Sequence, residues 1–268
     1  MNNFNITLVS NYELSEFISI MEKAASDLKP IDFVYEYCID TVKGNYRETK
    51  FKTFNDFMQF FDENDYRFDS LKMNLSGKNF IDFGKSGQRC SVYGEIDSTK
   101  FFDKVFKLID KKVLYAFLHN DLDILLSRSN KYRSWERRLG TVPSYIKFYE
   151  NPRFAGGERD KYLIDLESVP THHHFIMTGD KLWFGACAIM YFSELYYKYI
   201  PKEKWERFSD CEENIVLENG LRKVVLYNDL SDFENPDNRK KQWAFRKQLG
   251  IDEVAHKLIH DDINPTAV

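Results

Sequence analysis

Apolar residues recur along the chain with two different spacings, and each spacing predicts one kind of element. Within residues 12–28 they stand three or four positions apart, which places them on one face of a helix that ends before Pro30. Residues 53–63 and 99–112 show the same helical spacing. Runs rich in β-branched and aromatic residues predict strands at 4–9, 31–40, 46–51, 67–76, 78–84 and 89–96.

Two hairpins are predicted in the last hundred residues. Asn219-Gly220 lies between two apolar runs, and this pair favours a two-residue type I′ turn. A Thr-Gly-Asp turn separates the strand-like runs 172–177 and 181–192. A further strand is expected at 161–167.

Helix signals complete the C-terminal half. Residues 192–201 and 202–208 look helical, with a break at Pro201. Asn235-Pro236 predicts an N-cap and a first helical residue for a helix that Gly250 ends. Asp252 is then expected to cap a last helix.

Between residues 119 and 160 these signals weaken, and the chain becomes polar, basic and rich in turn residues. We therefore expect an N-terminal α+β unit at 1–118 and an irregular basic and aromatic connection at 119–160. A C-terminal α+β unit with two hairpins and terminal helices is expected at 161–268. The predicted class is α+β, with mostly antiparallel sheets, flanking helices and two packed subdomains.

Composition narrows the class of protein. Hydrophobic residues make up 43% of the 268 positions and charged residues 30%, which excludes a disordered chain. No run of 18 apolar residues and no basic, apolar leader is found, so we expect no signal peptide and no membrane span. The net charge of −4 argues against a general nucleic-acid binder.

Cysteine usage indicates the compartment. The four cysteines are widely spaced and form no Cys-x-x-Cys pair: Cys38, Cys90, Cys187 and Cys211. They predict free thiols in a reducing compartment, and we expect a cytoplasmic protein.

A run of three histidines raises the question of a metal site. On a strand, His172 and His174 would share one face, and such a pair binds zinc when further ligands are near. His256 and His260 stand four apart on the last predicted helix, as in metalloproteases, but Lys257 stands where those helices carry a glutamate. Solvated histidines are the commoner reason for both patterns. We predict neither a metal nor another cofactor.

Other catalytic motifs are incomplete. Residues 79–86 lack a phosphate-binding loop's first glycine, because Asn79 stands there, and their interior is strand-like. Cys187 lies in an apolar strand, which disfavours the thiolate that a nucleophile needs. Asp40, Glu48 and Lys50 match the acidic residue and the Glu-x-Lys of nuclease hairpins that hold a divalent cation. An exposed hairpin with cross-strand charge pairs explains the same residues.

Arginines interleaved with aromatic residues occupy 128–138, a combination that is enriched in protein-binding hot spots. We predict that a protein partner is contacted by Tyr132, Arg133, Trp135, Arg137 and Arg138. A solvated helix face is the alternative explanation. A second basic run lies at 239–248, where Trp243 and Phe245 are two apart and cannot both face the core of one helix.

The stretches GDKLWFGACAIMYFSELYYKYIPKEKWERF (179–208) and NPDNRKKQWAFRKQLGIDEVAHKL (235–258) resemble bacterial immunity proteins of polymorphic toxin systems. The resemblance is one of general character, covers mainly the C-terminal half and includes no diagnostic motif, so it assigns no functional residue. It implies a non-enzymatic protein that binds a cognate toxin domain tightly and blocks its active site. The alternatives are a metal-dependent nuclease-like enzyme that uses Asp40, Glu48 and Lys50, and a protein-binding adaptor.

Overall fold

A computed structural model describes ten segments of the chain: residues 4–25, 32–40, 45–64, 70–75, 80–86, 89–96, 100–154, 160–172, 174–175 and 182–263. The chain divides into two compact units. The first unit consists of Met1–Leu118, Tyr191–Glu194 and Val216–Arg222. The second unit consists of His119–Met190, Leu195–Ile215 and Lys223–Val268. Helices and antiparallel strands occur together, which confirms the predicted α+β class.

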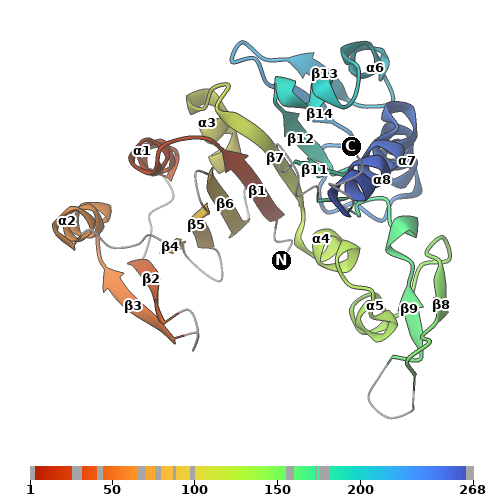
Figure 1. The fold of residues 1–268 in the computed structure, drawn as a ribbon, viewed down its shortest axis with the longest axis horizontal. Helices are drawn as coiled ribbons and strands as arrows, with labels where there is room; N and C mark the ends of the chain where they lie inside the picture. The colour runs from red at the N-terminus through yellow and green to blue at the C-terminus, as the bar shows by residue number, and fades with distance from the viewer. Residues whose placement is uncertain are drawn as a thin grey trace. The chain divides into compact units, whose positions relative to one another are not determined.

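The first unit is an antiparallel sheet with helices beside it (Figure 1). Its strands are β1 (Phe4–Ser10), β2 (Asp32–Asp40), β3 (Asn45–Phe51), β4 (Ser70–Asn74), β5 (Phe80–Ser86), β6 (Arg89–Ile96) and β7 (Val113–Asn120), whose last two residues belong to the second unit. Their order is β7-β1-β6-β5-β4-β2-β3. The helices are α1 (Leu14–Ala25), α2 (Phe54–Asn64) and α3 (Lys100–Leu108). Helices α1 and α3 pack against each other, and α2 lies against β2 and β3.

Alternation of side chains along the strands gives this sheet one buried face. The buried residues of three neighbouring strands lie opposite one another: Ile6, Leu8, Ile81, Phe83, Val92 and Gly94. Buried side chains of α1 and α3 at helical spacing complete the core: Phe17, Ile18, Met21, Phe102 and Val105. The period-2 and period-3.6 patterns of the sequence therefore predicted these elements correctly.

The turn at Asn219-Gly220 differs from the predicted two-residue type I′ turn. The backbone N–H of Leu217 donates to the carbonyl of Leu221, and Gly220 donates to Leu217, so three residues form the loop. Gly220 adopts a left-handed conformation, with φ of +86°. The Asn219 side chain instead donates to the carbonyl of Ile109 over 3.1 Å and accepts from Leu221.

The second unit contains shorter elements (Figure 1). Its helices are α4 (Asp121–Ser127), α5 (Tyr132–Leu139), α6 (Lys202–Arg207), α7 (Pro236–Leu249) and α8 (Ile251–Ile263), with 3-10 turns η1 (Leu166–Ser168) and η2 (Glu194–Lys198). Its strands are β8 (Phe148–Glu150), β9 (Tyr162–Ile164), β10 (His174–Phe175), β11 (Trp183–Phe184), β12 (Ile189–Phe192), β13 (Glu213–Val216) and β14 (Arg222–Val225). The last three strands each extend into the first unit, through Tyr191 and Phe192, Val216 and Arg222. Strands β8 and β9 pair, as do β10 and β11, while β14 lies between β13 and β12. Within the described segments, no helix is both long enough and apolar enough to cross a membrane.

Three predictions for this half need correction. Residues 119–160 were expected to be irregular, but they include α4, α5 and β8. The predicted helix at 192–201 is a 3-10 turn after a strand. Asp252 is not the cap of α8, because Gly250, with φ of +69°, both ends α7 and accepts the first hydrogen bond of α8 from Val254. The Asn235 cap of α7 is confirmed, since its side chain accepts from Asp237 over 2.9 Å. The Thr-Gly-Asp turn at 178–180 lies outside the described residues.

Gly94 of β6 is predicted to tolerate no side chain. A Cβ atom there would lie 2.8 Å from the carbonyl oxygen of Phe80 and 3.3 Å from the Cα of Ile81, so strand backbone would have to move. We expect Gly94→Ala to lower the free energy of unfolding by about 1–3 kcal/mol, measured by urea unfolding. The half-buried Thr7→Ala, on the neighbouring strand, is the control and should change stability by less than about 1 kcal/mol. Equal urea midpoints for Gly94→Ala and the unchanged protein would contradict this packing.

Candidate functional site

The histidines that were considered as metal ligands lie in a chain whose described part contains no group of three His, Cys, Asp or Glu side chains placed to hold an ion. His256 instead lies at the surface with Nε2 2.9 Å from Oε1 of Glu167. His172 has Nδ1 3.1 Å from the carbonyl oxygen of Ser127. The side chains of two further candidates lie outside the described residues: His174 and His260.

The nuclease-like residues are separated by the register of the β2–β3 hairpin. Asp40 lies opposite Asn45, whereas Glu48 lies opposite Glu36. Three residues separate Asn45 from Glu48, which is about 10 Å along a strand and an odd number of steps. The side chain of Asp40 lies outside the described residues, and the register alone places Asp40 away from Glu48 along the hairpin. The phosphate-loop candidate is also excluded, because its residues form β5, paired to β4 and β6.

Cys187 lies beside a histidine that the sequence analysis did not connect with it. Its Sγ is 3.9 Å from Nδ1 of His119, and both side chains are buried. Burial raises the pKa of the Cys187 thiol well above its usual value. Burial, assisted by the positive charge of Arg128, lowers the pKa of His119 to about 3. A neutral thiol beside a neutral imidazole has the composition of a catalytic dyad but not its charge distribution.

The predicted partner-binding run forms helix α5. Arg133, Arg137 and Arg138 are exposed, and Tyr132 is half-buried. Trp135 is only 1% exposed and donates its indole N–H to the carbonyl of Ser129 over 2.8 Å. The Trp135 side chain therefore belongs to the core beneath the helix, and only its neighbours remain candidates for contact with a partner.

A small apolar core fixes α5 beneath its exposed arginines. It consists of Leu126, Trp135, Ile146, Ile164 and Val169. The N-terminus of α5 is held by Asp160, whose carboxylate accepts from the backbone N–H of Arg133 over 3.3 Å. Gly140 ends the helix with φ of +80° and donates to Glu136. The helix is therefore fixed at both ends and along one face.

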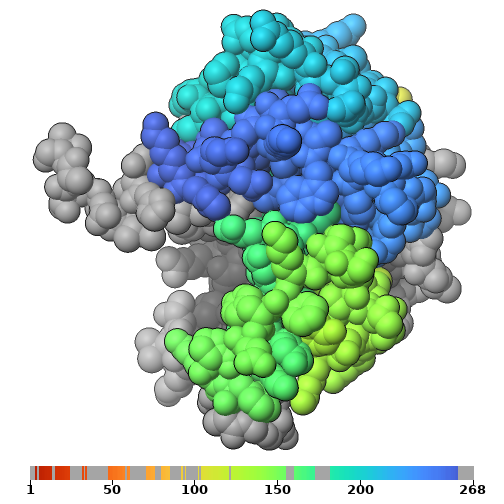
Figure 2. All heavy atoms as spheres, turned by 90° about the vertical axis from the view of Figure 1, so that its right-hand side faces the viewer, coloured from red at the N-terminus to blue at the C-terminus, as the bar shows by residue number. Residues whose placement is uncertain are grey.

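Strand β8 places aromatic side chains on the same part of the second unit. Phe148 is 49% exposed and the next residue, Tyr149, is 50% exposed. Phe148 packs edge-on against Tyr132 of α5 and Tyr162 of β9, with ring centroids 5.0 and 5.5 Å apart. The green atoms of this region form a continuous part of the face seen in Figure 2. We name Arg133, Arg137 and Arg138 together with Phe148 and Tyr149 the aromatic–basic surface.

Charge distinguishes this surface from the rest of the chain. Residues 128–161 contain nine lysines and arginines against four aspartates and glutamates, a net charge of +5, in a chain whose net charge is −4. Lys147, Arg153 and Lys161 of this segment are exposed. An acidic ligand would be attracted to this side of an otherwise acidic protein.

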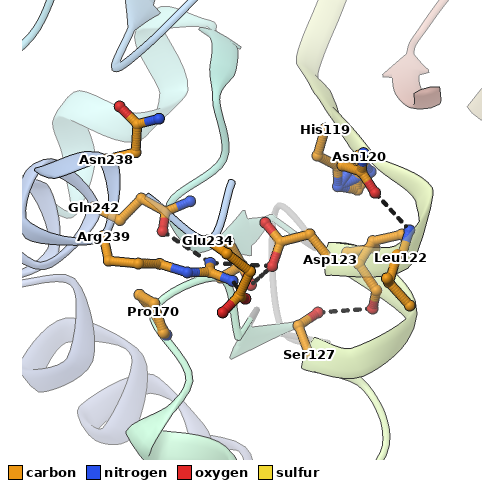
Figure 3. Close-up of polar contacts among 12 residues, drawn as sticks. His119, Asn120, Leu122, Asp123, Ser127, Pro170, Glu234, Asn238, Arg239 and Gln242 are labelled. Atoms are coloured by element: carbon orange, nitrogen blue, oxygen red, sulfur yellow. Dashed lines mark hydrogen bonds and ion pairs between the residues drawn. The ribbon is translucent and has the colours of Figure 1, made fainter. Parts of the chain in front are cut away.

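A buried ion pair joins helices α7 and α4 (Figure 3). Arg239 of α7 and Asp123 of α4 are 6% and 1% exposed, and their Nη1 and Oδ1 atoms are 3.1 Å apart. Asp123 also accepts from the Thr171 hydroxyl over 2.9 Å, and Arg239 donates to Gln242 over 3.0 Å. Burial raises the pKa of the Asp123 carboxyl, against the opposing influence of Arg239. Burial also disfavours the charged guanidinium, but Asp123 and its other acidic neighbours hold the pKa of Arg239 above its ordinary value.

This ion pair extends to the loop that leads into β8. Arg239 Nη2 is 2.6 Å from Oε1 of Glu234, and the Tyr145 hydroxyl donates to the same carboxylate over 3.2 Å. The guanidinium also lies over the rings of Phe233 and Tyr145, 5.1 and 5.9 Å from their centroids. Tyr145 comes three residues before Phe148, so the buried charges help to hold the start of the exposed strand.

Arg246 connects the helices to the histidine segment in the same way. It is 1% exposed, forms an ion pair with Asp252 and donates to the carbonyls of Pro170 and His172 over 3.1 and 2.6 Å. The charges of 239–248 indicated a second basic run on the predicted helix, and the burial of its two arginines was not foreseen. The available signal was the spacing: Arg239, Gln242, Phe245, Arg246 and Leu249 lie on one helix face, and all are buried.

Comparison with known proteins adds no assignment, because no protein family, no curated protein and no solved structure matches this chain. The site is therefore interpreted from its own geometry. It combines buried charges that fix the second unit with an exposed surface, on which Arg133 forms an ion pair with Asp160 over 3.8 Å.

Removing one member of the buried ion pair is predicted to destabilise the protein strongly. Arg239→Met leaves the buried Asp123 without its cation, and we expect the free energy of unfolding to fall by about 3–5 kcal/mol in urea titrations. Asp123→Asn combined with Arg239→Met removes both charges and keeps an acceptor for Thr171. The double variant should therefore be more stable than Arg239→Met alone. A double variant as unstable as the sum of the two single variants would contradict the coupling.

Stability is also predicted to depend on pH through His119. Its pKa is about 3 in the folded protein and 6.5 without the fold, so below pH 6.5 only the unfolded chain takes up the proton. The resulting stabilisation of the folded protein is complete above pH 6.5. As the pH falls toward 3 it is lost, by up to about 1.4 kcal/mol of unfolding free energy per pH unit. The free energy of unfolding, measured in urea at pH 7.5, 6.0 and 5.0, should fall less steeply with decreasing pH for His119→Gln than for the unchanged protein. Parallel slopes would show that His119 is not buried in its neutral form.

Proposed function

We propose that this chain is a non-enzymatic protein that binds an acidic protein partner through the aromatic–basic surface. The observation that carries the proposal is the exposure of two consecutive aromatic residues, Phe148 and Tyr149, on a strand beside exposed arginines. Consecutive strand residues point to opposite faces, so an ordinary hairpin on a core buries every second side chain. Here both faces of β8 present aromatic area to solvent, which suits a strand that a partner covers.

The energetic argument rests on area and charge. Covering the exposed half of each ring removes about 100 Å² from water, which contributes about 2–3 kcal/mol per ring before the cost of association. Arginine and tyrosine are enriched among residues that dominate binding energy. Arg133, Arg137 and Arg138 would add electrostatic steering, which acts mainly on the association rate.

We further propose that the partner is a toxin domain and that the complex neutralises it, as the resemblance of 179–208 and 235–258 to immunity proteins implies. A cytoplasmic location is part of this proposal. Cys187 and Cys211 are free thiols, as expected in a reducing compartment.

Capture and rescue together test this function. Tagged protein is used as bait in a lysate of its native cells, and the partner is identified by mass spectrometry. The proposal requires that the captured protein, expressed alone, arrests growth and that co-expression of this chain restores growth. A captured partner that does not arrest growth, or an arrest that this chain fails to relieve, overturns the neutralising role.

Charge reversal on α5 is predicted to slow association with that partner. Arg137→Glu with Arg138→Glu should lower the association rate constant at least tenfold at low ionic strength, measured by surface plasmon resonance, because the steering field is reversed. Lys247→Glu with Lys257→Glu makes the same change in net charge on exposed positions of α7 and α8, and it should have little effect. Equal effects of the two pairs would show that net charge, and not this surface, controls the rate.

A further inference from the structure

Strand β8 has an open edge, whereas its neighbour β9 is covered on both sides. On one side β9 pairs with β8. On the other side Leu163 of β9 forms a bridge with Lys131, and Ile164 donates to the carbonyl of Asn130 over 2.8 Å. Among the strands that the structure describes, β8 pairs with β9 alone.

The hydrogen bonds identify which main-chain groups face this open edge. Asp165 donates to the carbonyl of Lys147 over 2.9 Å, and Asn151 donates to the carbonyl of Lys161 over 2.8 Å. In an antiparallel ladder such bonds recur at every second residue, so Lys147, Tyr149 and Asn151 direct their main-chain groups toward β9. Phe148 and Glu150 therefore direct theirs away from it, which leaves two donors and two acceptors in a row on the outer edge.

We propose that this edge binds an extended acidic segment of the protein partner as a third strand. The inference rests on the proposed function and specifies how the partner docks. Alternating N–H and C=O groups at the two-residue repeat of a strand, about 7 Å, complement another peptide backbone, whereas a phosphate backbone could use only the donors. The exposed side chains of Phe148 and Tyr149 then pack against alternate residues of the added segment.

Charge selects an acidic segment. The net charge of residues 128–161 is +5, and the exposed cations Lys147 and Arg153 lie just before and just after β8. Glu150 is the one acidic side chain on the strand, and a charge at that place discourages indiscriminate strand pairing. An incoming segment with carboxylates near both ends meets the two cations and leaves Glu150 between them.

A display library of linear twelve-residue peptides, selected on the full chain, tests this docking mode. Selected peptides are synthesised with blocked ends, and their affinities are measured by fluorescence anisotropy. Two variants separate the main chain from the side chain at one position: Glu150→Pro removes the outward N–H, whereas Glu150→Ala keeps it. We expect acidic peptides to be enriched, to bind Glu150→Ala at least as well as the unchanged protein, and to bind Glu150→Pro at least tenfold more weakly.

Amide hydrogen exchange, followed residue by residue by NMR, gives a second readout that does not depend on a proline variant remaining folded. On binding of a selected peptide, the amides of Phe148 and Glu150 should become protected, while that of Tyr149, already directed toward β9, should change little. No enrichment, enrichment of neutral or basic peptides, equal affinity for Glu150→Pro, or no protection of these two amides would overturn the inference. Displacement of the peptide by single-stranded DNA at lower concentration would assign the edge to nucleic acid and overturn it as well.

The outcome separates this inference from the proposed function. A captured partner that requires Arg137 and Arg138 but binds Glu150→Pro normally leaves the function intact and overturns only the added strand. Selected peptides that satisfy both readouts, without a growth-arresting partner, support the strand edge and overturn the neutralising role.

Discussion

A guanidinium buried in the second unit is the constraint on which the rest of that unit depends. Arg239 is removed from water, so its charge must be met by protein groups, and they come from segments far apart in the sequence: Asp123, Tyr145 and Glu234. Directional hydrogen bonds allow little freedom in how these segments are arranged. The fixed interior gives α5 and β8 a defined position.

A preformed surface reduces the conformational entropy that is lost on association. The aromatic rings on β8 are attached to a hairpin whose other strand is held by the core around Trp135, so little backbone freedom remains to be lost on binding. Arginines on α5 keep their charged ends in solvent while the helix beneath them is fixed. The second unit therefore separates rigidity, supplied by buried charges and a small apolar core, from the exposed rings and charges that we propose for recognition.

The sequence predicted those elements whose signal is local. Alternation in β1, β4, β5 and β6 and the spacing of apolar residues in α1 and α3 follow from packing on one face. The caps of α7 follow from the chemistry of Asn235, Pro236 and Gly250. Helix α5 was considered only as an alternative for the 128–138 run, because its charged residues hid a sparse apolar spacing: Tyr132, Trp135 and Leu139, which pack in or against the small core.

What the sequence could not predict depends on distant partners. The side chain of Asn219 bonds a carbonyl 110 positions away, so a local turn preference could not reveal its use. Arg239 and Arg246 resemble surface residues until Asp123 and the carbonyls of Pro170 and His172 are placed beside them. Of the five predicted contact residues, Trp135 is no longer a candidate because it is buried. Phe148 and Tyr149 were not among the five, and only their exposure in the structure identified them.

The open edge of β8 also has a consequence for the protein in the absence of any partner. The main-chain groups of an open edge also match those of a second copy, which would bring the same rings. What opposes that encounter is like-charge repulsion between two segments of net charge +5, and this repulsion is screened within about 10 Å at 0.1 M salt. Added salt thus weakens attraction to an acidic segment and at the same time weakens the barrier to self-pairing. In the proposed docking mode, dilute electrolyte favours the heterologous strand and concentrated electrolyte favours the homotypic one.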